Sequence, residues 1–272
     1  MKHAELPRLL SPEQFEEQRR RDDILLVDLS EPATYVQHHV PGAVFMNYAW
    51  IVREQQPRMG LLPTPAQMEH VFSAYGLSPE THVVAYDDEG GGRACRLLYT
   101  LEVAGHRHYS LLDGGLRAWA NAGHPIDTEI HWPVPGRFTP QLDDAPVATR
   151  QYILDHLSDP DVVLLDARSR GEYIGEKCYA KRGGHIPGAV HMEWTEAMDR
   201  DRDLRLKPEP VLRDMLAERG VTPDKTVVVY CHTHHRSAHT WFLLKYLGFE
   251  KVKGYPGSWS DWGNEPNTPI EK

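Results

Sequence analysis

The sequence predicts an α/β protein made of two copies of one unit, each a mainly parallel sheet flanked by helices. Short apolar strands alternate with segments of helical pattern along the chain. One series of motifs occurs twice in the same order, which indicates a duplicated domain. The 272 residues, of which 40% are hydrophobic and 25% charged, suffice for two domains with separate cores.

The first half is predicted to alternate helices and strands. Helices are expected to begin at Ser11 and Thr64, because each hydroxyl can cap free N–H groups and the proline that follows fits the first helical turn. The remaining predicted elements are strands at 24–29 and 83–86, a helical turn at 31–35, a helix from the glycine-rich loop 87–92 to Gly105, and a short helix around Trp119.

The second half repeats the first at offsets of 138 to 146 residues. The matched pairs are Asp28 with Asp166, Pro41 with Pro187, Tyr86 with Tyr230, Gly114 with Gly257, and Trp119 with Trp262. Much of the change in offset arises from an insertion around 176–182. We therefore expect domains at 1–123 and 148–272, joined by a proline-rich surface linker at 124–147.

The most informative stretch is a strand–loop–helix turn in the second half. The pattern predicts a buried strand at 227–230 and an apolar helix from Ala238 to Gly248. The loop between them, residues 231–236 (the cysteine loop), begins with Cys231 and ends with Arg236. Such a turn aims backbone N–H groups and the positive end of a helix at one point, so a thiol placed there loses its proton easily. The sequence therefore predicts an anion cradle that holds a nucleophile.

Two other interpretations of the cysteine loop remain open. A cysteine after a strand is often a small buried hydrophobe, although four of the six loop residues carry imidazole or guanidinium, which a buried structural turn would not tolerate. Cys231, His232, His234 and His235 are also possible metal ligands. Zinc usually takes ligands from separated segments, so we expect neither a metal nor a cofactor here.

The corresponding loop of the first half, residues 87–92 (the aspartate loop), has Asp87 where the second half has Cys231. It is acidic and rich in glycine. We interpret Asp87 as an ordinary carboxylate at the end of a strand, in a loop that is the opposite of an anion cradle. The first domain is accordingly expected to be catalytically inactive.

Composition restricts the partners of the chain. A net charge of −9 at pH 7 makes it a poor nucleic-acid binder, so any anion site must be a local positive region. Its apolar runs are too short to span a membrane, and the N-terminus has no apolar signal core. Three cysteines without clustered spacing argue against a disulfide framework and favour a reducing cytoplasm. We expect a monomer that binds neither nucleic acid nor membrane.

The motifs resemble the rhodanese family in its tandem-domain form. Residues 35–43 are similar to its N-terminal signature, and residues 254–262 to its C-terminal signature, with Asp261 where Glu is more usual. The cysteine loop resembles the six-residue active-site loop of the family. It lacks the Gly and Val usual before the closing Thr in thiosulfate and mercaptopyruvate enzymes, and it looks closest to a bacterial variant with a Thr-His-His-Arg loop.

The resemblance implies a thiosulfate sulfurtransferase in which Cys231 carries sulfur as a persulfide and passes it to cyanide or a thiol. It implies that Arg236 and Arg182 hold the small-molecule donor. The other implied substrate-binding residues are His232, Thr233, His234 and His235. The alternatives are a 3-mercaptopyruvate sulfurtransferase and a non-catalytic binding module of the same fold. A phosphatase of similar type would have a loop one residue longer, C-x-x-x-x-x-R. The loop from Cys231 to Arg236 is the shorter form.

Overall fold

The computed structural model describes residues 4–272 and consists of two compact units. The first unit contains the chain up to Ile51, Pro63–Asp143 and Met198–Leu206. The second contains Val52–Leu62, Asp144–Ala197 and Lys207–Lys272. The units therefore follow the two halves of the sequence, except that each half gives one short segment to the unit of the other. Most of the expected linker, up to Asp143, belongs to the first unit.

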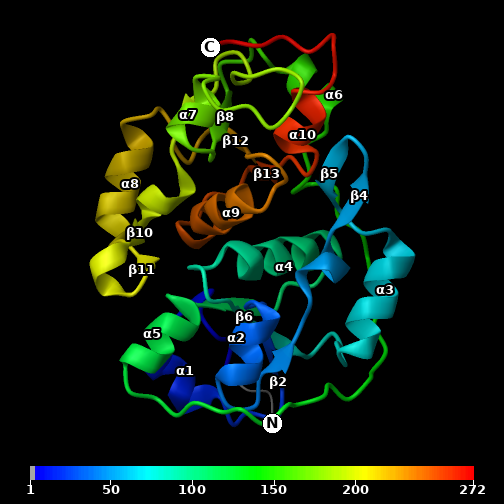
Figure 1. Ribbon diagram of the computed structural model, residues 1–272, viewed down its shortest axis with the longest axis vertical. Coiled ribbons are helices and arrows are strands. Elements are labelled where there is room, and N and C mark those ends of the chain that lie inside the picture. Colours follow the sequence, from blue (N-terminus) through cyan, green and yellow to red (C-terminus); the bar gives the residue numbers. More distant parts are fainter. Residues whose placement is uncertain (1–3) are drawn as a thin grey trace. The chain divides into compact units, whose positions relative to one another are not determined.

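The first unit is built on a five-stranded parallel sheet (Figure 1). Its strands, in spatial order, are β1 (Leu9–Leu10), β7 (Tyr109–Leu112), β6 (His82–Tyr86), β2 (Ile24–Asp28) and β3 (Val44–Phe45). Its helices are α1 (Pro12–Gln18), α2 (Pro32–Gln37), α3 (Pro65–Ala74), α4 (Gly92–Val103) and α5 (Gly115–Asn121), with a 3₁₀ turn η1 at Tyr48–Ile51. The predicted starts of α1 and α3 are confirmed, because Ser11 and Thr64 each form a capping box.

The second unit repeats this plan with a four-stranded parallel sheet. Its strands, in spatial order, are β13 (Val252–Gly254), β12 (Thr226–Tyr230), β8 (Val162–Asp166) and β9 (Val190–His191). Its helices are α6 (Arg150–Asp155), α7 (Arg170–Tyr173), α8 (Glu209–Ala217), α9 (Arg236–Tyr246) and α10 (Ser258–Trp262), with a 3₁₀ turn η2 at Trp194–Ala197. The predicted α/β class with mainly parallel sheets is confirmed.

Two short antiparallel hairpins are the segments that the halves exchange. The hairpin of β4 (Arg53–Gln55) and β5 (Arg58–Leu61) comes from the first half of the sequence and belongs to the second unit. The hairpin of β10 (Met198–Asp199) and β11 (Arg205–Leu206), which flanks a 3₁₀ turn η3 at Arg200–Arg202, makes the opposite exchange. Sequence patterns missed both, because their strands are short and polar and lack a period-two alternation of apolar residues.

The sheet of the second unit fixes the place of its chemistry. Strand β12 lies between β13 and β8, and Tyr230 pairs with Asp166 at the carboxyl ends of the two inner strands. Ligands of open parallel sheets bind at this edge. Helix α9 begins at Arg236 and not at Ala238 as expected, so the last residue of the cysteine loop is already the first helical residue.

Among residues 4–272, no helix combines the length and the apolar character needed to cross a membrane. The core of each unit lies where its helices cover its sheet. In the second unit, the five residues from Val227 to Cys231 are all fully buried. The nucleophile candidate thus lies at the end of the most deeply buried strand of its sheet.

Candidate active site

Cys231 directly follows β12 and is buried. Its backbone N–H donates to the Ser258 hydroxyl oxygen at 3.2 Å, and its carbonyl accepts the Trp259 N–H at 3.0 Å. Both partners belong to α10, the helix of the predicted C-terminal signature. These two bonds hold the backbone of the cysteine, so its side chain has a defined direction at the start of the loop.

The Cys231 sulfur accepts hydrogen bonds from the backbone N–H groups of Thr233 and Ser237 and from the Ser237 hydroxyl. Burial alone would raise the pKa of the thiol, but the charge of Arg236 and these donors outweigh it, so the pKa of Cys231 is lowered. These donors and the charge of Arg236 favour the thiolate form of Cys231. Sequence reasoning missed Ser237, although it follows the loop arginine directly.

The peptide between His232 and Thr233 is held by a residue of α10. The His232 carbonyl accepts the Ser260 N–H at 2.9 Å, which turns the N–H of the same peptide toward the sulfur. Ser260 is tied in turn to β5, because its hydroxyl accepts the Met59 N–H at 2.9 Å. In Figure 1, β5 lies beside α10. The hairpin from the first half thus supports the cysteine loop.

Gly60 on β5 makes the closest approach to the loop. A Cβ atom built on this glycine would lie 1.9 Å from the Thr233 carbonyl oxygen, and its φ of +70° is in the region that favours glycine. No other residue fits this place without moving the loop. Nothing in the local sequence Arg-Met-Gly-Leu indicated such a contact, since its partner is more than 170 residues away in the chain.

Arg236 is engaged by Glu172, a residue of the short helix α7. Its two terminal nitrogens donate to the two Glu172 carboxylate oxygens at 2.7 and 2.9 Å, a bidentate pair. Burial would raise the pKa of Glu172, but Arg236 and Ser169 outweigh it and hold that pKa at about 2. The guanidinium fork therefore faces a carboxylate of the protein, while its charge still acts on the Cys231 sulfur.

The three loop histidines differ in environment. His234 is fully buried, and its Nδ1 lies 2.7 Å from the Ser237 hydroxyl oxygen. His232 is half-buried, with its ring centroid 5.9 Å from that of Tyr179. His235 is half-buried, with its ring centroid 6.0 Å from that of Trp194.

Burial lowers the pKa of His232, with Arg236 adding to the effect and Glu172 opposing it. His232 therefore carries less positive charge near neutrality than an exposed histidine would.

Arg182, the other predicted donor ligand, has structural contacts. Its terminal nitrogens donate to the carbonyl oxygens of Trp262, Glu265 and Thr268 and to the Thr268 hydroxyl. These bonds hold the chain after α10. A role of Arg182 in donor binding stays a prediction without a contact that supports it.

A second buried ion pair supports the same edge of the sheet. Arg168, only 1% exposed, donates to both carboxylate oxygens of Asp166, and its guanidinium lies 4.3 Å from the centroid of the Trp259 ring. Asp166 pairs in register with Tyr230, the residue before Cys231. This pair fixes the floor beneath the cysteine loop.

The aspartate loop of the first unit has an unexpected arrangement. The Asp87 carboxylate accepts four backbone N–H groups, those of Glu89 and Gly91 on Oδ1 and those of Arg93 and Ala94 on Oδ2, at 2.7 to 3.0 Å. The expectation that this loop is the opposite of an anion cradle is wrong. It is an anion cradle, and the side chain of its own aspartate fills it.

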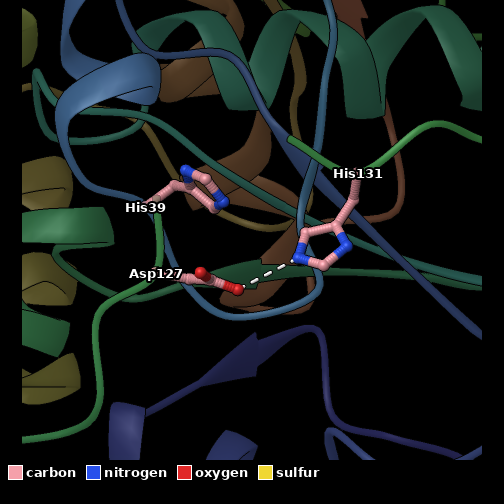
Figure 2. Close-up of side chains that lie close together, drawn as sticks. All are labelled: His39, Asp127 and His131. Carbon is pink, nitrogen blue, oxygen red and sulfur yellow. Dashed lines mark hydrogen bonds and ion pairs between the residues drawn. The ribbon is translucent and has the colours of Figure 1, made fainter. Parts of the chain in front are cut away.

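One group of side chains in the first unit has the composition of a metal site. His39, Asp127 and His131 lie close together (Figure 2). Both ring nitrogens of His39 already contact carbonyl oxygens, those of Tyr35 at 2.7 Å and Glu129 at 3.0 Å, so the ring offers no free nitrogen to an ion. Its stacking on Tyr35 makes it a structural group of the fold.

The same device recurs in the second unit. There His185 stacks on Tyr173 at a centroid distance of 3.8 Å and contacts its carbonyl oxygen at 2.9 Å. A tyrosine–histidine stack therefore marks the same step of both repeats. This explains why a histidine precedes the Pro-Gly-Ala segment in each half of the sequence.

Comparison with known proteins identifies the family. The family model of the rhodanese-like domain matches residues 11–122 and again residues 149–265. The chain therefore belongs to the rhodanese family, with one such domain in each half of its sequence.

Its relatives cover the whole chain. Proteins named thiosulfate sulfurtransferase from Pseudomonas aeruginosa and Azotobacter vinelandii are 43% and 44% identical over 98% of both chains in each case. A sulfur carrier protein from Thermus thermophilus is 34% identical over 92% of this chain and 88% of its own. The solved structure of the anaerobic ergothioneine biosynthesis enzyme from Chlorobium limicola has a TM-score of 0.85 at 23% identity, and the match covers 97% of this chain and 70% of that one. At that identity the likeness concerns the fold alone.

Proposed function

We propose that this protein is a thiosulfate sulfurtransferase that carries the transferred sulfur on Cys231. The observation that carries the proposal is the buried Cys231 thiol, whose pKa is lowered by Arg236 and by donors of the cysteine loop. Relatives with this name match 98% of the chain. A soft nucleophile in an anion cradle is the chemistry that sulfur transfer requires, and it needs no cofactor.

The reaction has two steps. The Cys231 thiolate attacks the outer sulfur of thiosulfate, the sulfur–sulfur bond of thiosulfate breaks, and sulfite leaves with the electron pair. Cyanide or a thiolate then attacks the outer sulfur of the persulfide and restores the Cys231 thiolate. The N–H groups of Thr233 and Ser237 would spread the negative charge of the sulfur atoms during both steps.

The role that we propose for Arg236 differs from that expected of a donor ligand. Because Glu172 occupies its fork, Arg236 would act by its charge on the sulfur and would not clamp the sulfonate. The donor oxygens would instead meet half-buried side chains of the loop that can donate hydrogen bonds, such as His235 and Thr233. A compact dianion is favoured over the planar carboxylate of mercaptopyruvate, which an unoccupied arginine fork would hold better.

The direct test measures thiocyanate formation from thiosulfate and cyanide by the pure protein, with 3-mercaptopyruvate as the competing donor. We expect a larger kcat/KM for thiosulfate. Mass spectrometry after thiosulfate treatment should find one extra sulfur on the peptide that contains Cys231. A larger kcat/KM for mercaptopyruvate would overturn the donor assignment, and a protein without sulfur on Cys231 would overturn the mechanism.

A sulfur carrier is the second candidate, favoured by the relative from Thermus thermophilus that bears this name. A carrier would form the Cys231 persulfide but release it poorly to cyanide. The two functions are separated by single-turnover kinetics: an enzyme loses its persulfide to millimolar cyanide within its turnover time, whereas a carrier keeps it until a protein acceptor is added.

We also propose that the protein works as a monomer in the cytoplasm. All three cysteines, Cys95, Cys178 and Cys231, are free thiols, as a reducing compartment would keep them. Light scattering of the pure protein tests the monomer, and cell fractionation tests the compartment.

A further inference from the structure

We infer that His234 is a positioning residue for the nucleophile: it holds the Ser237 hydroxyl so that the hydroxyl proton is directed at the Cys231 sulfur. His234 lies in the middle of the cysteine loop, three residues after Cys231 and three before Ser237. The inference uses the proposed function only in taking Cys231 as the nucleophile.

The hydrogen bonds around Ser237 define the direction of its proton. A serine hydroxyl has one proton to donate and can also accept. The Ser237 hydroxyl bonds to the Cys231 sulfur, and a thiolate can only accept, so the hydroxyl must donate to it. His234 Nδ1, 2.7 Å from the same oxygen, must then carry a proton and donate. The chain of donors therefore runs from His234 through Ser237 to Cys231.

The backbone of His234 gives an independent reason to assign a role to its side chain. His234 has a φ of +54°, in the left-handed region that is unfavourable for residues with a Cβ atom. The matching residue of the aspartate loop is Gly90, with a φ of +97°. Both loops need this backbone conformation, but only the loop with the cysteine has a side chain there.

Burial keeps this chain of donors intact. His234 and Ser237 are both fully buried, so water does not compete for the serine hydroxyl. In the aspartate loop the residue that matches Ser237 is Arg93, which has no hydroxyl, and its backbone N–H serves Asp87. The hydroxyl relay is thus confined to the loop whose occupant is a thiol.

Other groups also act on the sulfur, and the experiment must separate them from His234. Arg236 on α9 faces it, and Glu172 on α7 neutralises part of that charge. The remaining titratable or charged neighbours of this edge are Asp166 at the end of β8, Arg168 after it, His232 in the loop, and His235 with His239 on the side of Trp194. Substitutions at His234 and Ser237 leave all of these in place.

The first test needs no substitution. In the wild-type protein at a pH above that of thiol ionisation, long-range nitrogen–proton NMR should find His234 protonated on Nδ1. If Nδ1 carries no proton, Ser237 donates to His234 instead of Cys231, and the inference is overturned. Because a histidine placed only by packing can adopt either tautomer, this readout distinguishes positioning from a structural role.

The second test measures the pH dependence of Cys231 alkylation in three variants. Ser237→Ala removes the hydroxyl, and His234→Gly removes the imidazole while suiting the left-handed backbone. We expect each to raise the thiol pKa by about one unit, the value of one hydrogen bond to a charged group. His234→Asn is the conservative variant, because asparagine tolerates this backbone and places an amide donor near the position of Nδ1. It should restore most of the shift.

The double variant His234→Gly with Ser237→Ala decides whether the two side chains act as one unit. If His234 acts through Ser237, the double variant should shift the pKa no more than Ser237→Ala alone. Additive shifts, or an unchanged pKa in His234→Gly, would overturn the inference. Alkylation and NMR use no sulfur donor, so failure here is distinguishable from failure of the thiosulfate assay.

Discussion

The aspartate loop and the cysteine loop show what the fold supplies and what a single side chain adds. Each loop follows an inner strand of a parallel sheet, β6 or β12, and leads directly into a helix. Each points backbone N–H groups at the first side chain of the loop. In the first unit the Asp87 carboxylate accepts four of these groups. The scaffold therefore directs backbone donors at the first side chain of the loop in both units, and only the second unit has a thiol there.

The charged side chains nearest the two loops have opposite signs: Glu89 lies near Asp87, and Arg236 lies near Cys231. Burial and the neighbouring Glu89 raise the pKa of Asp87 to about 6, although its backbone donors oppose this. Near Cys231, the charge of Arg236 helps the donors overcome burial. The backbone N–H groups alone therefore do not lower the pKa of the side chain that they bind. A nearby positive charge, as Arg236 provides for Cys231, is also needed.

The comparison predicts its largest effect for Cys231→Ser. A serine keeps the shape of the cysteine loop but is too weakly acidic to act as the nucleophile at neutral pH. We expect thiocyanate formation to fall by at least about a thousandfold, with an unchanged melting temperature. The matched control is Cys178→Ser at an exposed thiol, which should keep full activity. A Cys231→Ser protein with a sizeable fraction of activity would contradict the assignment.

Sequence patterns were sufficient for the parts of this comparison that are local in the chain. The strand before Cys231, the N–H groups after it and the helix that follows are encoded within about twenty residues, so their periodicity and capping signals predict them. The matching of Asp87 with Cys231 followed from the repeat alone.

The parts that sequence patterns missed depend on contacts between distant segments. The partner of Arg236 is Glu172, 64 residues earlier, and the loop rests on Gly60 in a hairpin from the other half. Neither contact has a local pattern. The aspartate loop was misjudged for another reason: its acidic composition is visible in the sequence, but the inward direction of the Asp87 carboxylate is not.

The next prediction concerns the ion pair between Arg236 and Glu172. Glu172→Gln should destabilise the protein by about 2–3 kcal/mol at pH 7, because Arg236 loses its carboxylate partner in a largely buried site. The Glu172 pKa is lowered to about 2 in the folded state, below its ordinary value of 4.5. Its stabilising contribution is therefore complete above about pH 4.5 and is lost as the pH falls toward 2.

Chemical unfolding between pH 2 and 7 checks this prediction. The wild-type free energy of unfolding should fall more steeply below pH 4.5 than that of Glu172→Gln. Glu176→Gln, at an exposed glutamate in the same unit, is the control and should follow the wild type. Parallel pH profiles for all three proteins would show that the ion pair contributes nothing to stability.

A smaller effect is expected from the hairpin that supports the cysteine loop. In Gly60→Ala, the new methyl group would lie 1.9 Å from the Thr233 carbonyl oxygen, so the loop must shift. Since the Thr233 N–H binds the Cys231 sulfur, we expect kcat/KM to fall by about tenfold, a misplacement that costs about 1.4 kcal/mol of transition-state stabilisation.

Gly220→Ala is the matched control for Gly60→Ala. Its φ of +72° is nearly that of Gly60, but nothing lies within 4 Å of a Cβ atom there. Both variants carry the same backbone strain, so Gly220→Ala measures the stability that this strain alone costs. Gly60→Ala should lose at least as much stability, because it adds the clash with Thr233, and only Gly60→Ala should lose activity. Equal kcat/KM values in the two variants would mean that the hairpin does not position the loop.

The last prediction transfers the nucleophile to the other cradle, through Asp87→Cys on the Cys231→Ser background. The new thiol would have the amides of the aspartate loop but also Glu89, and the guanidinium of the nearby Arg93 is held by Glu31 and Asp88. Cys95, near the start of α4, shows the effect of this environment: burial, the largest cause, raises its pKa well above the ordinary value. Glu89 adds to this effect, as does the Asp87 charge that the variant removes. We therefore expect no thiocyanate formation and no sulfur on the introduced thiol in intact mass spectra after thiosulfate treatment. If this variant formed a persulfide, the cradle amides alone would activate a thiol, and the charge of Arg236 would be dispensable in the second unit.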